Sequence, residues 1–238
     1  MSMYDDFGLN NTVPKETNNF KGFLYVCFKL IMLFVILLFL LTGFTNTINV
    51  SSIEEKIDLS NISEPTQYAT LGGTTLEING GKADITYIAE YSLSGRVVDV
   101  ENYYGSNIRN QLSPKDIGIA WGFLATDENQ EKIRWTSTGN RFLSWFIPDG
   151  EWYREIGGES AVIAHHSNNH LIPFDSNVEK LIKKIKKDDY VKVEGYLVNI
   201  NWKKDDGTYF YWNTSTSRND DGDGACEVIY VTNVTWLK

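Results

Sequence analysis

The chain has 238 residues, 42% of them hydrophobic, so it is long enough and apolar enough to build a sizeable folded domain. Its formal net charge of −9 at pH 7 disfavours binding to a phosphate backbone, because lysine and arginine supply most of the affinity for phosphate. Nucleic acid is therefore not an expected partner. The two cysteines, Cys27 and Cys226, are too few for a disulfide framework.

Residues 1–21 are polar and show no periodicity, and we expect them to form a loosely ordered cytoplasmic leader. An apolar segment follows, FLYVCFKLIMLFVILLFLLTGF, from Phe23 to Phe44, with Lys29 as its one charge. A helix of this length runs about 33 Å at ~1.5 Å per residue, enough to cross a hydrocarbon core of ~30 Å. The sequence therefore predicts a transmembrane helix over residues 22–44 that anchors the chain in the membrane lipid bilayer.

The lysines that flank this segment predict its orientation. Lys15 and Lys21 precede it and only Lys56 follows it within twenty residues, a bias that favours a cytoplasmic N-terminus. The C-terminal part would then lie outside the cytoplasm, as the domain of a single-pass cell-membrane protein. A cleaved signal peptide is the alternative. The long apolar run and the lack of a small-residue cleavage site directly after it favour an uncleaved signal anchor.

Residues 45–70 contain few large apolar side chains, a composition typical of a stalk or linker, and Ser52 with Glu55 predicts a short helix there. From residue 71 to residue 238 the pattern changes to one mainly β domain, extracytoplasmic in this interpretation. Alternation and turn residues predict extended segments in that domain over residues 74–78, 83–91, 91–103, 117–125, 133–147, 160–164, 189–202 and 225–237.

One amphipathic helix interrupts these strands. Asp175 or Ser176 can cap its start, and Val178, Leu181 and Ile182 recur on one face at the helical period. Its lysines collect toward the C-terminal end, where they complement the helix dipole. A basic surface for an anionic lipid or polymer is the alternative interpretation of these lysines.

The order of strands, helix and further strands resembles the OB-type five-stranded barrel, here with an added N-terminal hairpin. The segments GRVVDV, DDYVKVEGYLV and CEVIYVTNV would be its first, fourth and fifth strands. An irregular α+β sandwich is the alternative fold. The segments AHHSNNHLIP and TSRNDDGDGACE are also similar to segments of uncharacterised, singly membrane-anchored prokaryotic proteins, a resemblance that implies no activity.

All three histidines of the chain, His165, His166 and His170, lie in AHHSNNHLIP, which we expect to form a loop at the end of a strand. Imidazole titrates near neutrality and is the commonest metal ligand, so this loop is a candidate site. His166 and His170 have the spacing of half a zinc site and are the candidate metal ligands. In the alternative, Asn168 and Asn169 hydrogen-bond the local backbone and the loop is purely structural.

The second candidate segment, SRNDDGDGACE, contains carboxylates that imitate the opening of a calcium loop. The imitation fails at its twelfth position, which is Tyr230 and not glutamate, so a solvated hairpin is favoured. Arg218 or Asp220 could face the histidines across a cleft, and Cys226 could act as a nucleophile beside them. As the first apolar residue of a strand, Cys226 is more typical of a core position.

Two functions from different classes follow. The leading hypothesis is a binding module for a small ligand, an envelope polymer such as a polysaccharide, or an envelope protein; its ligand-binding residues are His166, Asn168, Asn169, His170 and Arg218. Rings between Trp202 and Trp212 could stack on sugars or on a partner protein. The alternative is a hydrolytic enzyme, with or without a metal, whose catalytic candidates are His165, His166, His170, Asp220, Asp221 and Cys226. The sequence identifies no cofactor.

Overall fold

The computed structural model describes Phe23, Tyr25 and residues 27–34, 53–56, 58, 59 and 61–238. The chain divides into two compact units, Met1–Asn49 and Val50–Lys238. In the first unit Phe23, Tyr25 and residues 27–34 are helical. No helix among the residues that the structure describes is long and apolar enough to cross a membrane. The predicted leader over 1–21, and the predicted membrane helix over 22–44 in large part, lie outside these residues, so both stay predictions.

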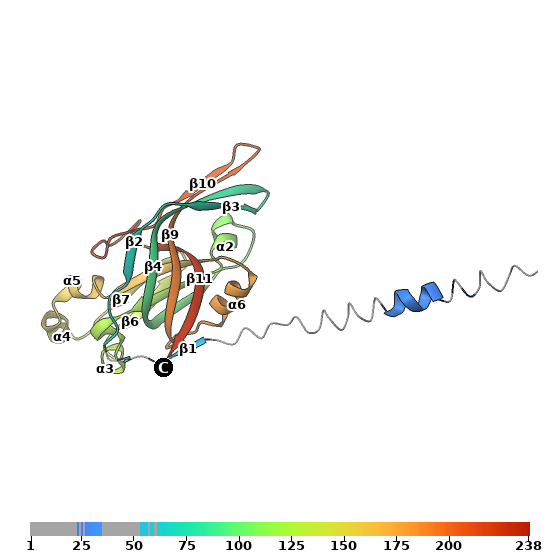
Figure 1. Ribbon diagram of the computed structural model, residues 1–238. Coiled ribbons are helices and arrows are strands. Elements are labelled where there is room, and N and C mark those ends of the chain that lie inside the picture. The colour runs from blue at the N-terminus through green and yellow to red at the C-terminus, as the bar shows by residue number, and fades with distance from the viewer. Residues whose placement is uncertain (1–22, 24, 26, 35–52, 57, 60) are drawn as a thin grey trace, which may run out of the picture. The chain divides into compact units, whose positions relative to one another are not determined.

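The second unit, Val50–Lys238, is mainly β (Figure 1). Its strands are β1 (Ile53–Glu55), β2 (Thr66–Ala69), β3 (Gly73–Ile78), β4 (Gly81–Asn102), β5 (Lys115–Ala120), β6 (Arg134–Thr138), β7 (Phe142–Phe146), β8 (His166–Pro173), β9 (Tyr190–Lys204), β10 (Tyr209–Trp212) and β11 (Glu227–Leu237). Its helices are α2 (Ile108–Leu112), the 3-10 turn η1 (Gly122–Ala125), α3 (Asp127–Gln130), α4 (Gly150–Glu155), α5 (Gly158–Ile163) and α6 (Ser176–Lys184).

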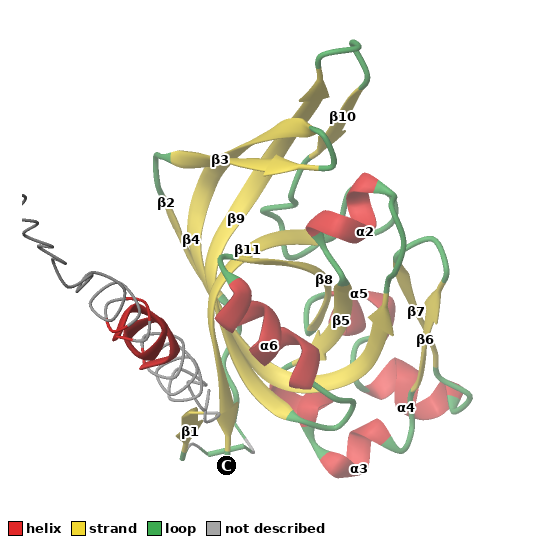
Figure 2. Cartoon of the chain, turned by 90° about the vertical axis from the view of Figure 1, so that its right-hand side faces the viewer, coloured by secondary structure: helices red, strands yellow, loops and turns green. Residues whose placement is uncertain are grey.

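Five strands pair in a closed ring in the order β4, β5, β8, β11 and β9, and β9 pairs back with β4 (Figure 2). All these pairs are antiparallel except β8 with β11, which is parallel. The N-terminal half of β4 and the C-terminal half of β9 extend beyond the ring and pair with β3 and β10 (Figure 1). The predicted hairpin between β3 and β4 is confirmed, with Asn79 and Gly80 both at positive φ in its turn.

Alternation along the strands separates a core face from a second face. On β11, Ile229 and Val231 belong to one buried cluster, whereas Val228 and Tyr230 belong to another. Strand β8 divides in the same way, because Leu171 lies in the first cluster and Ile172 in the second. The ring therefore encloses its own core and presents a second, partly polar face on which a site can form.

Helix α6 packs against β8 and β11 and confirms the predicted amphipathic helix (Figure 2). Asp175 is its N-cap and accepts hydrogen bonds from the backbone N–H groups of Asn177 and Val178 at 2.8 and 2.9 Å. At the other end, the buried Lys115 Nζ donates to the carbonyl oxygens of Lys183 and Ile185 at 3.1 and 2.8 Å. The helix is thereby fixed to β5 through the orphan carbonyls of its last turn.

Glycines allow the ring to close where strands approach most tightly. A Cβ at Gly195 would lie 2.1 Å from the Tyr230 carbonyl oxygen, and one at Gly95 would lie 2.4 Å from that of Ala120. The register of β4 shifts between Val97 and Asp99 and between Tyr87 and Ala89, not at Gly95, so Gly95 serves the close approach to β5.

Several segments differ from their sequence-based predictions. The stretch 45–70 is not simply a stalk, because β1 pairs with β11, β2 pairs with β4 and Ile62 is buried in the core. Long-range pairing with β11 also overrides the short helix expected around Glu55. Residues 160–163 of the strand predicted over 160–164 lie in α5, because Gly157 at φ 104° starts a new helix after α4, and Ala164 is the C-cap of α5.

The predicted histidine loop is strand β8. Its polar residues alternate between the two faces, with Ser167 and Asn169 buried among the ring strands and His166 on the opposite side. Because both faces carry polar side chains, the hydrophobic alternation that marks most strands is absent from the sequence here.

Candidate ligand-binding site

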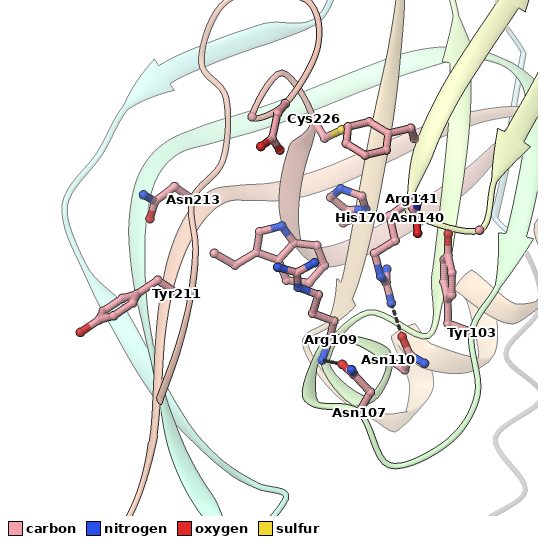
Figure 3. A pocket seen from close by; sticks show the side chains of 15 residues that line it. Tyr103, Asn107, Arg109, Asn110, Asn140, Arg141, His170, Tyr211, Asn213 and Cys226 are labelled. Atoms are coloured by element: carbon pink, nitrogen blue, oxygen red, sulfur yellow. Dashed lines mark hydrogen bonds between the residues drawn. The ribbon is translucent and has the colours of Figure 1, made fainter. Parts of the chain in front are cut away.

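A cavity of about 790 Å³, here called the first cavity, lies where several segments of the second unit meet (Figure 3). It is bounded by the connection between β4 and β5, the turn between β6 and β7, strand β10, and the loop that precedes β11; His170 reaches it from β8. Its lining is rich in aromatic residues and asparagines, namely Tyr103, Phe142, Tyr211 and Trp212 with Asn107, Asn110, Asn140 and Asn213.

Arg141 holds the first cavity together from the β6–β7 turn. Its φ of 68° lies in the left-handed region, which costs a non-glycine residue about 1 kcal/mol or more. Its Nη1 donates to Asp116 Oδ1 at 2.7 Å, and its Nη2 donates to Asn110 Oδ1 and to the Ser113 carbonyl oxygen, both at 2.9 Å. These bonds tie the turn to β5 and to the α2 segment, and they offset the cost of the backbone conformation.

Two aromatic rings enclose the same guanidinium. The Arg141 Cζ atom lies 3.7 Å from the centroid of the Tyr103 ring and 5.3 Å from that of Trp212. Burial lowers the pKa of Arg141, and the Asp116 carboxylate opposes that effect. Trp212 also lies against His170, with ring centroids 4.7 Å apart. The indole is therefore positioned by two other residues and borders the cavity on one side.

Asp116 and His170 face each other across β5 and β8 as direct partners in the register. His170 Nδ1 lies 2.9 Å from Asp116 Oδ2, and the side chains are 4% and 3% exposed. Neither atom makes a hydrogen bond in the described part of the chain. Together with Arg141, these residues form a buried cluster whose opposite charges offset one another, so the cavity floor presents no isolated buried charge.

The groups that remain open to a ligand are mostly neutral. The side chains of Asn140 and Asn213 are exposed and make no hydrogen bond within the part of the chain that the structure describes. The exposed Arg109 guanidinium stacks on Phe210 at 5.1 Å, and Asp223 contributes one carboxylate. Figure 3 shows Tyr211 turned outward, whereas His170 and Arg141 point inward.

A second cavity of about 260 Å³ adjoins the first, with Phe142 and Cys226 lining both. This second cavity brings together six residues predicted from the sequence: His166, Asn168, Arg218, Asp220, Asp221 and Cys226. His165 lines neither cavity. Its Nδ1 lies 2.7 Å from the Ala161 carbonyl oxygen and its ring packs edge-on against Phe123.

Asn168 and Asn169 point to opposite sides of β8 and serve the framework. Asn168 Nδ2 donates to the Arg141 carbonyl oxygen at 2.6 Å and contacts Cys226 Sγ at 3.4 Å. Asn169 is fully buried and its Nδ2 donates to the Ile117 carbonyl oxygen at 3.2 Å. Asn169 is therefore remote from both cavities, and Asn168 helps to fix the turn that carries Arg141.

His166 has a defined tautomer. Its Nδ1 lies 2.7 Å from the Val162 carbonyl oxygen, which can only accept, so Nδ1 carries the proton and Nε2 is an open acceptor in the neutral ring. Burial lowers the pKa of His166, with a smaller opposing effect from Asp221. The imidazole is accordingly neutral at pH 7 and can accept a proton or a hydrogen bond.

Neither a thiolate nor a shared metal fits these residues. Burial raises the pKa of Cys226 to about 12, so at neutral pH it is a thiol and a poor nucleophile. His166 and His170 lie four positions apart in one strand, roughly 13 Å at ~3.3 Å per residue, too far for a single ion. No group of three histidine, cysteine, aspartate or glutamate side chains that could hold a metal occurs among the described residues.

Glu227 is a further buried group at the second cavity. It is 1% exposed, its Oε1 accepts from Arg218 Nη1, and its Oε2 has no hydrogen-bond partner in the part of the chain that is described. Burial raises the pKa of this carboxyl to about 7, and the attraction of Arg218 only partly offsets that effect. Glu227 also interacts electrostatically with Asp220 of the loop and with Tyr91 of β4, whose ring lies against Arg218.

Comparison with known proteins adds no relative: no family model, no curated protein and no solved structure matches this chain.

Replacing Arg141 with Met should lower the free energy of unfolding by about 3–5 kcal/mol, because Asp116 would stay buried without its partner. Urea denaturation followed by tryptophan fluorescence measures the change. Arg134→Met removes an exposed arginine of β6 and should change stability by at most ~0.5 kcal/mol. Equal effects of the two substitutions would contradict the role given to Arg141.

The raised pKa of Glu227 predicts a pH dependence of stability with a defined sign. The unfolded carboxyl loses its proton near its ordinary pKa of 4.5 and the folded one near 7, so the stability contribution is complete below 4.5 and is lost as pH rises through 7. Relative to Glu227→Gln, the wild-type protein should therefore lose stability across this window in urea titrations. A relative gain with rising pH would show instead that the pairing with Arg218 outweighs burial.

Proposed function

We propose that the unit Val50–Lys238 is a saccharide-binding module built on an OB-type barrel. The strand order of the ring supports this assignment, because β4, β5, β8, β9 and β11 take the places of OB strands one to five. The parallel pairing of β8 with β11, and α6 between β8 and β9, agree with it.

The position of the first cavity is the observation that carries the proposal. OB domains bind oligosaccharides and oligonucleotides on the face of strands two and three, between the loops that join strands one to two and four to five. Here those loops are the β4–β5 connection and the segment between β9 and β11. They supply Tyr103, Asn107 and Arg109 on one side and Trp212, Asn213 and Asp223 on the other.

The chemistry of the lining favours sugars over nucleic acid. An aromatic ring gives a sugar an apolar platform, and asparagine amides both donate to and accept from hydroxyl groups. The buried charges of Arg141 and Asp116 already pair with each other. A strand of phosphates would need an excess of basic groups, whereas the whole chain carries a net charge of −9.

Substituting Trp212 by alanine should weaken binding of neutral oligosaccharides at least about thirtyfold, as expected when a central aromatic contact worth ~2 kcal/mol is lost. Tyr209→Ala is the matched control, because Tyr209 is 66% exposed on the same hairpin and lines neither cavity. Calorimetric titration with a panel of neutral oligosaccharides at low and high salt measures both variants.

Binding of single-stranded DNA that falls steeply with salt, or no binding of any saccharide, would contradict this proposal. Salt-independent saccharide binding with turnover of the bound sugar, lost in His166→Gln, would support the hydrolase that the sequence left as the alternative.

We also propose that residues 22–44 anchor this module in a membrane, with the module outside the cytoplasm. The described residues of this segment support it, because Phe23, Phe28, Leu33 and Phe34 are 63–66% exposed apolar side chains on helical backbone. The transfer of such side chains from water to lipid is energetically favourable.

The double substitution Leu33→Asp with Phe34→Asp should release the protein from the membrane, since each aspartate near the middle of a spanning helix costs about 2.5–3.5 kcal/mol. Carbonate-washed membranes from expressing cells should retain the wild type and lose the variant. Recovery of the wild-type protein in the supernatant would overturn the anchor.

A further inference from the structure

The second cavity differs from the first in its chemistry. Part of its lining is apolar, formed by Phe142, Leu143 and Ile163. The remainder comes from His166, from Glu227 and from the loop over residues 217–222. A ligand that fills this volume of about 260 Å³ must therefore offer both a short apolar part and a polar end.

The ionisable side chains of this cavity offer hydrogen-bond acceptors. Glu227 is 1% exposed, and its Oε2 has no hydrogen-bond partner in the described part of the chain, although burial of an unpaired acceptor is costly. His166 directs its Nδ1 proton to a carbonyl oxygen, which leaves Nε2 as an acceptor. The Asp221 carboxylate accepts one bond from the Gly222 N–H at 2.7 Å and has further capacity.

The net charge of the cavity lining also favours a ligand that carries positive charge and donates hydrogen bonds. Three carboxylates, those of Asp220, Asp221 and Glu227, line it beside the single guanidinium of Arg218. That guanidinium is already engaged, because Nη1 donates to Glu227 and Nη2 donates to Gln67 Oε1 at 3.2 Å. The lining is thus short of positive charge.

A divalent cation does not meet these requirements. Calcium takes about six to eight oxygen ligands and magnesium about six in near-octahedral order. No set of three suitable side chains converges to hold a metal in the described residues. A primary ammonium is a single positive charge that needs fewer oxygen ligands, through N–H···O contacts of about 2.7–2.9 Å, and its carbon stem contacts the apolar lining.

We propose that the second cavity binds a primary ammonium group on an apolar stem, as in an alkylamine or a lysine side chain, with its acceptors drawn from His166 Nε2, Asp221 and Glu227. This proposal does not rest on saccharide binding in the first cavity. It assigns a role to the unpaired Glu227 oxygen and to the imidazole acceptor, neither of which the first cavity uses.

The test is an NMR titration of the full chain with propylammonium chloride. Saturable shifts are expected in the backbone amides of residues 217–222 and at the start of β8. Asp221→Asn keeps the acceptor for Gly222 but removes the charge, and should weaken binding at least about tenfold, as for one charged hydrogen bond. The isosteric Glu227→Gln should weaken it too. Asp205→Asn, which removes an exposed charge from the β9–β10 turn, should not.

Three results would overturn the proposal. N-propylacetamide binding as well as propylammonium would mean that the cavity recognises the apolar stem alone. Equal weakening by Asp205→Asn and Asp221→Asn would reduce the effect to general electrostatic attraction. Calcium chloride shifting the same amides and displacing the amine would make this a divalent-cation site. Because propylammonium carries no sugar, each result is independent of saccharide binding.

Discussion

The ion pair between Arg141 and Asp116 is buried on both sides, with side chains 8% and 3% exposed. A pair this deep repays its desolvation only when further hydrogen bonds satisfy the remaining donors, and Arg141 has such bonds to Asn110 and to Ser113. The ion pair itself reaches β5, and these two bonds reach the α2 segment. The pair therefore specifies the geometry of the first cavity more than it adds stability, because the walls belong to short turns and helices with little core of their own.

The ring of strands makes this arrangement possible by separating two faces. Its interior is filled mainly by aliphatic side chains, and alternation places the polar cluster on β5 and β8 on the opposite face. Asp116 and His170 are direct register partners, and a one-residue slip of either strand would turn its own polar residue toward the core.

Much of the fold could be predicted from the sequence where one pattern dominates. The amphipathic helix α6 and the hairpin of β3 with β4 have strong local signals, in an aspartate cap and an Asn-Gly turn. Strand β8 has none, because polar side chains occupy both of its faces. Arg141 could not be predicted at all: nothing in TSTGNRFLS distinguishes it from a solvent-exposed arginine, since its partners come from β5 and α2, 25 to 31 residues away.

Strand direction explains why the histidine segment AHHSNNHLIP and the aspartate segment SRNDDGDGACE lie close together. Strands β8 and β11 run parallel, with Asn169 opposite Glu227, so the chain enters both strands from the same end. The loop before β11 is thereby brought beside the start of β8, and His166 meets Asp221 in one cavity. An antiparallel pair would have placed these segments at opposite ends of the sheet. The proximity of the two segments depends on the parallel direction of β8 and β11. Sequence periodicity does not reveal strand direction, so no motif in either segment predicts it.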